Sequence, residues 1–130
     1  MRTTGQKVSI LSFFLIIFGS VLLSACGGDD SGGGDIVASS TQFNTDRLTF
    51  VAGEQISLEF VNEDSFEHNW ALYESQADAK AKQHPIAIAE TVTAGSTTVE
   101  FTAPDEGEYP FQCDLHPTMN GTATVQAPRA

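Results

Sequence analysis

Three residues near the C-terminus, Cys113, His116 and Met119, have the types and the spacing of a metal-binding loop. They follow one another in the pattern C-x2-H-x2-M, at the end of a predicted strand and the start of a tight loop that contains Pro117. A thiolate, an imidazole and a thioether together suit copper, because soft sulfur combined with nitrogen holds a metal that cycles between two oxidation states. The loop therefore predicts a copper site.

The fourth ligand has to come from another part of the chain, which contains three histidines in all. His68 opens a predicted strand, whereas His84 precedes Pro85 in a predicted surface loop. Adding His68 gives two histidines, one cysteine and one methionine, the ligand set of blue-copper electron-transfer centres. Each of these residues taken alone is more often a core or surface residue, and it is their joint spacing that favours the metal site.

Alternating apolar and polar side chains indicate that short strands surround these residues. His68 and Cys113 fall on the inward faces of two such strands, beside Trp70 and Phe111, which we expect in the core. About seven to eight strands separated by turn residues predict an all-β sandwich of one domain. The strands expected are residues 36–39, 48–51, 56–62, 68–73, 97–102, 109–113 and 121–125.

The segment 74–94 breaks this strand pattern. Ser75 and Asp78 have the spacing of a capping box that opens a short helix over residues 76–82. The helix ends before His84 and Pro85, because the residue before a proline is disfavoured in the helical region. We therefore expect one short helix in the loop near 75–84, with His84 on the surface.

The first 25 residues read as a lipoprotein signal peptide. Arg2 and Lys7 precede an apolar run that ends in the letters LSAC, the form of a bacterial lipoprotein signal cleaved before Cys26. A retained membrane helix is the alternative, because the run of 18 residues is borderline for spanning a bilayer. With lipid attached to Cys26, a flexible linker over 26–34 would tether a domain of residues 35–130 to a membrane, on its periplasmic or other extracytoplasmic face.

Charge and cysteine content exclude several classes of function. The formal net charge is −11, and it becomes −13 without residues 1–25, which carry two basic residues and no acidic ones. Such a chain is repelled by nucleic acid. With Cys26 lipidated, Cys113 has no partner for a disulfide. Metal coordination accounts for a free thiol in a compartment where thiols are otherwise oxidised.

These motifs resemble those of the cupredoxins, the small blue-copper proteins, over about residues 36–127. The loop from Cys113 to Met119 is similar to that of amicyanins, whereas the letters HNW at 68–70 resemble azurins and auracyanins. The sequence departs from these families in two ways. Its loop from Cys113 to Met119 is shorter than in the azurin and auracyanin type, and it lacks the N-terminal disulfide of azurins. The resemblance implies a Greek-key β-sandwich that binds one mononuclear type 1 copper through His68, Cys113, His116 and Met119.

The resemblance also implies roles for residues around the metal. Asn69 would brace the ligand loop by hydrogen bonds, and the backbone carbonyl of Glu67 would make a weak fifth contact with copper. Backbone N–H groups near Asp114 and His116 are expected to donate to the Cys113 sulfur and so tune its reduction potential.

The function implied is that of a carrier of single electrons between membrane redox complexes outside the cytoplasm. We expect no catalysis, because four protein ligands leave no open position for a substrate. The expected partners are redox proteins with a basic docking face, and the chain is expected to be a monomer. One alternative is a copper-binding or copper-trafficking lipoprotein, against which counts that Met1 and Met119 are the only methionines of the sequence. Another is a structural lipoprotein without metal.

Overall fold

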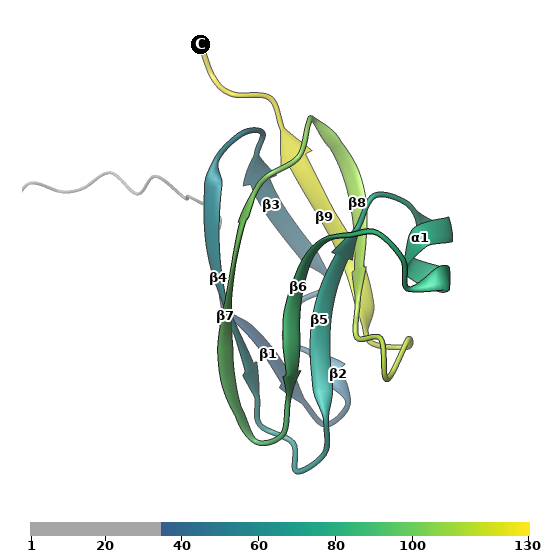
Figure 1. Cartoon of the computed structure of the whole chain (residues 1–130). Helices are drawn as coiled ribbons and strands as arrows, with labels where there is room; N and C mark the ends of the chain where they lie inside the picture. Colours follow the sequence, from purple (N-terminus) through teal and green to yellow (C-terminus); the bar gives the residue numbers. More distant parts are fainter. Residues whose placement is uncertain (1–34) are drawn as a thin grey trace, which may run out of the picture.

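The computed structural model describes residues 35–130, which fold into two packed β-sheets and one short helix (Figure 1). The four-stranded sheet has the order β2-β1-β4-β7, and the five-stranded sheet has the order β3-β9-β8-β5-β6. The expected all-β sandwich is thereby confirmed. The elements are β1 (Ile36–Ser39), β2 (Gln42–Phe43), β3 (Arg47–Val51), β4 (Gln55–Asn62), β5 (His68–Tyr73), α1 (Gln76–Ala81), β6 (Pro85–Val92), β7 (Gly95–Thr102), β8 (Gly107–Gln112) and β9 (Asn120–Gln126).

The chain crosses repeatedly between the two sheets, which ties both sheets to one core. Two of the resulting strand pairs are parallel, β1 with β4 and β3 with β9, and the other pairs are antiparallel. The expected signal segment, Cys26 and the linker lie outside the described residues. Among the helices of residues 35–130, none is long and apolar enough to cross a membrane.

The two faces of β4 show why these residues form a half-buried strand. Ile56, Leu58 and Phe60 are buried, whereas Ser57 and Glu59 between them are exposed. One face of an antiparallel sheet can pack on the core while the other meets water, and a period of two residues satisfies both. The apolar side chains of β4 therefore close one side of the core.

Strand β5 is buried along its whole length because it is covered on both faces. Trp70 and Leu72 belong to the main core, as expected for Trp70. On the opposite face Ala71 and Tyr73 form a second cluster with Ala79 of α1. The short helix thus shields the outer face of the strand that begins with His68.

Helix α1 begins and ends as its sequence predicts, within one residue. The side chain of Ser75 caps its N-terminus by accepting a hydrogen bond from the backbone N–H of Asp78. Lys82, in the left-handed conformation with φ of 53°, ends it. His84 lies beyond this cap with an exposed side chain, in agreement with its prediction as a surface residue.

The pairing of β5 with β8 places the candidate ligands at one end of the sandwich. The two strands are antiparallel, with Ala71 opposite Gln112 and Leu72 opposite Phe111. The start of β5 therefore lies beside the end of β8. His68 is the first residue of β5, and Cys113 directly follows β8. The loop that runs from Cys113 to the start of β9 closes this end.

Candidate metal centre

The metal-binding atoms of Cys113, His68 and His116 meet at this end of the sandwich. The Sγ atom of Cys113 lies 3.7 Å from Nδ1 of His68 and 3.8 Å from Nδ1 of His116. All three ligand atoms lie within 4.8 Å of one another. A trigonal metal about 2.3 Å from sulfur and about 2.05 Å from nitrogen would hold those two atoms about 3.8 Å apart. The spacing therefore fits a metal bound between them.

Met119 joins these three residues through the folding of its loop. Its N–H donates to the carbonyl of His116 at 2.8 Å, and its own carbonyl accepts from the N–H of Cys113 at 2.9 Å. The N–H of His116 donates to the carbonyl of Cys113 at 3.3 Å. These bonds bring the two ends of the loop together, and Met119 is buried with 2% of its surface exposed.

The four side chains differ in their access to solvent. His68 and Cys113 are fully buried, whereas His116 is partly exposed. The half-exposed ring of Phe66 packs edge-on against both imidazoles, with centroids 5.0 Å from His68 and 5.8 Å from His116. Leu115, also half-exposed, lies in the same loop as His116. The site therefore reaches the surface at His116, beside two apolar side chains.

Asn69 binds the residue that follows the cysteine, in the manner expected of a brace for the ligand loop. Its Oδ1 accepts from the N–H of Asp114 at 2.7 Å, and its Nδ2 donates to the Asp114 carboxylate at 3.1 Å. The N–H groups of Asp114 and His116 thus donate to oxygen atoms, Oδ1 of Asn69 and the Cys113 carbonyl. For these two N–H groups, the prediction that they donate to the Cys113 sulfur is therefore wrong.

The carboxylate of Asp114 receives two further hydrogen bonds. The hydroxyl of Tyr73 and Nε2 of Gln112 each donate to its Oδ1 at 2.9 Å. Nε2 of Gln112 also donates to the carbonyl of Ala79, so helix α1 is connected to the ligand loop. Burial of Tyr73, together with its hydrogen bond to Asp114, raises the pKa of its phenol and keeps it a donor.

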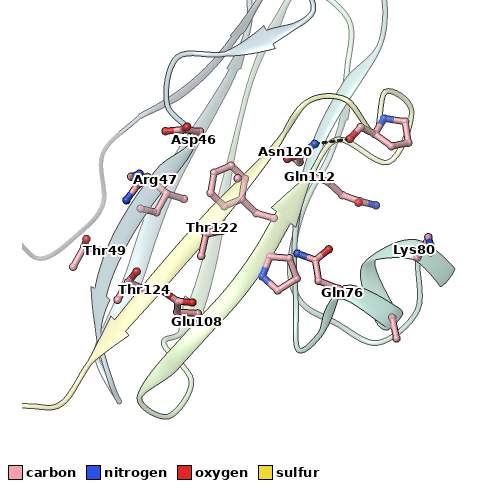
Figure 2. A pocket seen from close by; sticks show the side chains of 16 residues that line it. Asp46, Arg47, Thr49, Gln76, Lys80, Glu108, Gln112, Asn120, Thr122 and Thr124 are labelled. Carbon is pink, nitrogen blue, oxygen red and sulfur yellow. Dashed lines mark hydrogen bonds between the residues drawn. The ribbon is translucent and has the colours of Figure 1, made fainter.

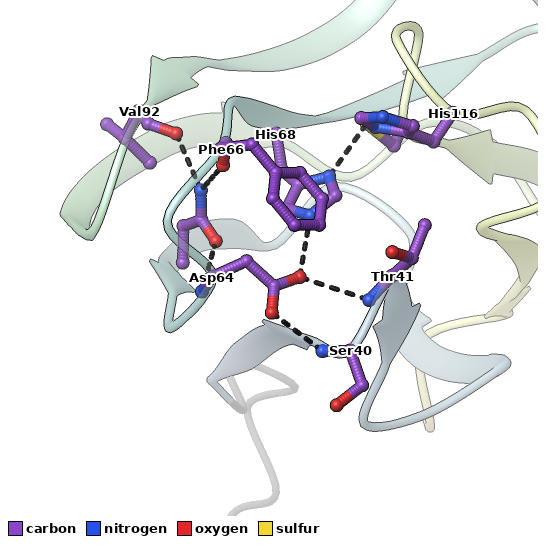
Figure 3. Close-up of polar contacts among 9 residues, drawn as sticks. Ser40, Thr41, Asp64, Phe66, His68, Val92 and His116 are labelled. Atoms are coloured by element: carbon purple, nitrogen blue, oxygen red, sulfur yellow. Dashed lines mark hydrogen bonds and ion pairs between the residues drawn. The ribbon is translucent and has the colours of Figure 1, made fainter.

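A second carboxylate, that of Asp64, contacts His68 on the side of the ring away from the cysteine (Figure 3). Its Oδ2 lies 2.8 Å from Nε2 of His68. The N–H of Thr41 also donates to this oxygen, and the N–H of Ser40 donates to Oδ1. The Thr41 hydrogen bond lowers the pKa of Asp64 most, and the contacts with His68 and Ser40 lower it further against the effect of burial.

The structure brings the four predicted ligands together and leaves His84 out of the cluster. Glu67 precedes His68 in the chain, and the contact of its carbonyl with a metal stays a prediction. Sequence reasoning missed Asp64, Phe66 and the side chain of Asp114. Asp114 could have been found as the neighbour of Cys113, whereas Asp64 lies in an irregular loop whose sequence gives no periodic signal.

A broad depression lies on the outer face of the five-stranded sheet (Figure 2). It has a volume of about 970 Å³ and runs along β3, β9 and β8 beside α1. Arg47, Lys80 and Glu108 are among the mostly polar side chains that line it, and none of the four predicted ligands does. The depression is therefore separate from the candidate metal centre.

Comparison with protein families gives one match, to the cupredoxin-like domain, over residues 11–125. No curated protein sequence matches the chain. Solved structures match it over most of the described residues. Auracyanin from Roseiflexus castenholzii is 24% identical, with a TM-score of 0.62 over 73% of this chain and 99% of its own.

Two further structures show the same likeness. Auracyanin A from Chloroflexus aurantiacus, described as a "blue" copper protein, is 27% identical with a TM-score of 0.61, over 72% of this chain and 98% of its own. Amicyanin from Paracoccus versutus is 22% identical with a TM-score of 0.51, over 72% of this chain and 81% of its own. The architecture described above is thus shared with proteins of both kinds.

Proposed function

The chain belongs to the cupredoxin-like family, and on this basis we propose that it is a blue-copper protein that carries single electrons. The observation that carries the proposal is the convergence of one cysteine sulfur and two imidazole nitrogens, with Met119 close to them. Two histidines, a cysteine and a weakly bound methionine are the ligands of blue-copper centres, and His68, Cys113, His116 and Met119 would supply them here. Structural zinc sites instead use histidine and cysteine without thioether.

When bound, copper supplies the one-electron couple between its two oxidation states, and the protein supplies a rigid cage. His68 and Cys113 are fixed by β5 and β8, which pair with each other. His116 and Met119 are fixed by the hydrogen bonds that close their loop. Side chains held in this way move little when the charge of the metal changes, and small reorganisation favours fast electron transfer.

The exposure of the ligands supports electron transfer over substrate chemistry. His68 and Cys113 are fully buried and Met119 nearly so, and with His116 they would form a complete set of four protein ligands. A catalytic metal site usually keeps an open position for water or substrate. The partly exposed ring of His116 offers the shortest route for an electron from the metal to a docked protein, and we propose no enzymatic activity.

The proposed site of action is a membrane surface outside the cytoplasm, between redox complexes whose docking faces are basic. This proposal rests on the sequence of residues 1–34, in which Cys26 follows a lipoprotein-type signal. Acyl chains at Cys26 would supply the membrane affinity. Cys26→Ala is expected to shift the protein from the membrane fraction to a soluble or unprocessed form. Mature protein that stays membrane-bound without lipid would show that the apolar run is a retained helix.

The experiment that tests the function is the absorption spectrum of the purified protein after loading with copper(II). We expect an intense visible band from charge transfer between the thiolate and copper. The band should vanish on addition of one reducing equivalent per copper and return on oxidation. A colourless copper complex would overturn the blue-copper assignment. A coloured protein that exchanges no electrons reversibly would favour copper trafficking instead.

A further inference from the structure

The loop between β4 and β5 places a carboxylate against the buried edge of His68. The side chain of His68 is fully buried, and that of Asp64 is 12% exposed. The two lie 2.8 Å apart, between Asp64 Oδ2 and His68 Nε2. A carboxylate that is largely removed from water interacts more strongly with its neighbours than one at the surface. Asp64 is therefore placed to influence the ring that holds one of the proposed ligand nitrogens.

The contact fixes which nitrogen of His68 carries the proton. A carboxylate accepts hydrogen bonds, so Nε2 must be the donor, and in the neutral imidazole Nδ1 is then left with its lone pair. Nδ1 is the atom that faces the Cys113 sulfur, at 3.7 Å. The tautomer that Asp64 selects is thus the one that can bind a metal between His68 and Cys113.

Asp64 is itself held from two sides. The turn between β1 and β2 has Ser40 and Thr41 in the left-handed conformation, with φ of 54° and 58°. Both residues donate their N–H groups to the carboxylate, Ser40 to Oδ1 at 2.8 Å and Thr41 to Oδ2 at 3.0 Å. These bonds leave the carboxylate little freedom to turn away from His68.

Asn62, at the end of β4, braces the loop from within. Its Oδ1 accepts from the N–H of Asp64 at 2.9 Å, and its Nδ2 donates to the carbonyls of Phe66 and Val92 (Figure 3). Asn62 is buried, with 2% of its surface exposed. The position of Asp64 is therefore set by the β1–β2 turn, β4 and β6, and not by the His68 contact alone.

We propose that Asp64 is a positioning residue that locks His68 in the ligating tautomer and, through its negative charge, favours oxidised over reduced copper. The inference rests on the proposed function and deepens it. Hydrogen bonds from a carboxylate to a metal-binding histidine raise the basicity of the ring, and their loss commonly changes metal affinity 10–100-fold. A more basic ligand binds copper(II) better than copper(I), so Asp64 should lower the reduction potential.

A purely structural role, in which Asp64 only closes the turn at Ser40 and Thr41, would leave the potential unchanged. Asp64→Asn removes the charge and keeps one oxygen that can accept from Nε2 of His68 and from the N–H of Thr41. Its amide nitrogen cannot accept from the N–H of Ser40, and the thermal melts measure the cost of that lost bond. Glu63→Gln is the matched control, since Glu63 is the exposed neighbour of Asp64 and the charge change is the same. We expect Asp64→Asn to shift the ratio of copper(II) to copper(I) affinity roughly tenfold, a rise of about 59 mV in potential.

The measurement is redox titration of the copper-loaded variants, with thermal melts to compare their stability. A rise in Asp64→Asn but not in Glu63→Gln supports the proposal. Equal potentials in the wild type and Asp64→Asn, or equal shifts in the two variants, would overturn it.

A second measurement needs no variant and no metal. Nitrogen-15 NMR of the copper-free wild type should show neutral His68 protonated at Nε2 alone. Protonation at Nδ1, or a rapid mixture of both tautomers, would refute the positioning role. If the wild type binds no copper, the proposed function fails, and the tautomer still decides whether Asp64 positions His68.

Discussion

The four proposed ligands of this site fall into two pairs, one held by strands and one held by a loop. His68 and Cys113 flank the paired ends of β5 and β8, whereas His116 and Met119 depend on the hydrogen bonds of one short loop. Cysteine is the ligand whose chemistry is least replaceable, because the thiolate supplies the charge-transfer absorption as well as a bond. Among the three histidines, His84 differs from the two proposed ligands because it lies at the surface, beside Asp78.

The ligand assignment predicts opposite results for two substitutions. Cys113→Ser should abolish the intense visible absorption of the copper-loaded protein, because a hydroxyl cannot replace the thiolate. His84→Ala should leave the spectrum unchanged, because its side chain is 82% exposed and stands outside the ligand cluster. The measurement is absorption at equal protein and copper concentrations. Bleaching by His84→Ala would show that the assignment of His68 as a ligand is wrong.

Site residues could be predicted from the sequence where they lie close together in the chain, and were missed where their contacts lie far away in it. Cys113, His116 and Met119 could be read from the sequence because their spacing is local. Asp64 could not, because its role depends on the turn at 40–41, more than 20 residues earlier. The pairing of β1 with β4 brings that turn beside the β4–β5 loop.

Among the elements, β6 shows why part of the fold was not predicted. Its inward positions are the small residues Ala87 and Ala89, whereas Ile88 points outward with 47% exposed, so no ordinary apolar alternation is visible. The register explains this pattern, because Ala89 lies opposite Trp70 and Ala87 opposite Leu72. Small side chains there leave room for the large ones of β5. The two-residue strand β2 was too short to leave any periodic signal.

Strand β9 makes a close approach that allows no side chain at Gly121. A Cβ atom there would overlap the ring of Phe111 and the carbonyl of Asp46, whose oxygen accepts from the N–H of Thr122. We expect Gly121→Ala to lower the free energy of unfolding by about 1–3 kcal/mol, the usual cost of overpacking a core. The measurement is urea denaturation of the copper-free protein.

Gly95→Ala is the matched control for this substitution. The nearest atom to a Cβ at Gly95 is the carbonyl oxygen of Thr93 at 4.0 Å, so the added methyl group has room. Removing a glycine without strain restricts the unfolded chain, so stability should be unchanged or slightly higher. Equal losses of stability in the two variants would show that the contact of β9 with Phe111 and Asp46 is not the cause.

For the whole molecule, the distribution of charge bears on partner choice. The formal net charge is −11 for the full sequence, and −13 without the proposed signal segment. The loop of residues 116–120 contains no acidic residue, lysine or arginine, and Phe66 and Leu115 add exposed apolar surface near it. Asp114 beside this loop is occupied by hydrogen bonds from Asn69, Tyr73 and Gln112. A small uncharged surface thus lies at the exposed edge of His116, on a strongly acidic molecule.

We predict that the redox partner docks against this uncharged surface. The surrounding acidic residues should steer a partner with a basic face, so association should slow as salt screens the field. Thr118→Glu adds a charge inside the loop, where Thr118 is exposed and does not belong to the ligand cluster. The substitution should slow electron transfer several-fold, because a charge would be buried at the docked surface. The absorption spectrum should change little.

The measurement is stopped-flow oxidation of the reduced protein by a candidate partner, at low and at high ionic strength. Thr49→Glu is the matched control, because Thr49 is exposed on β3 and the charge change is the same. A loss of rate in Thr118→Glu but not in Thr49→Glu would place the docking surface at His116, and equal rates in all three proteins would place it elsewhere. A rate that rises with salt would mean that the partner is acidic as well, because screening accelerates the association of like-charged molecules.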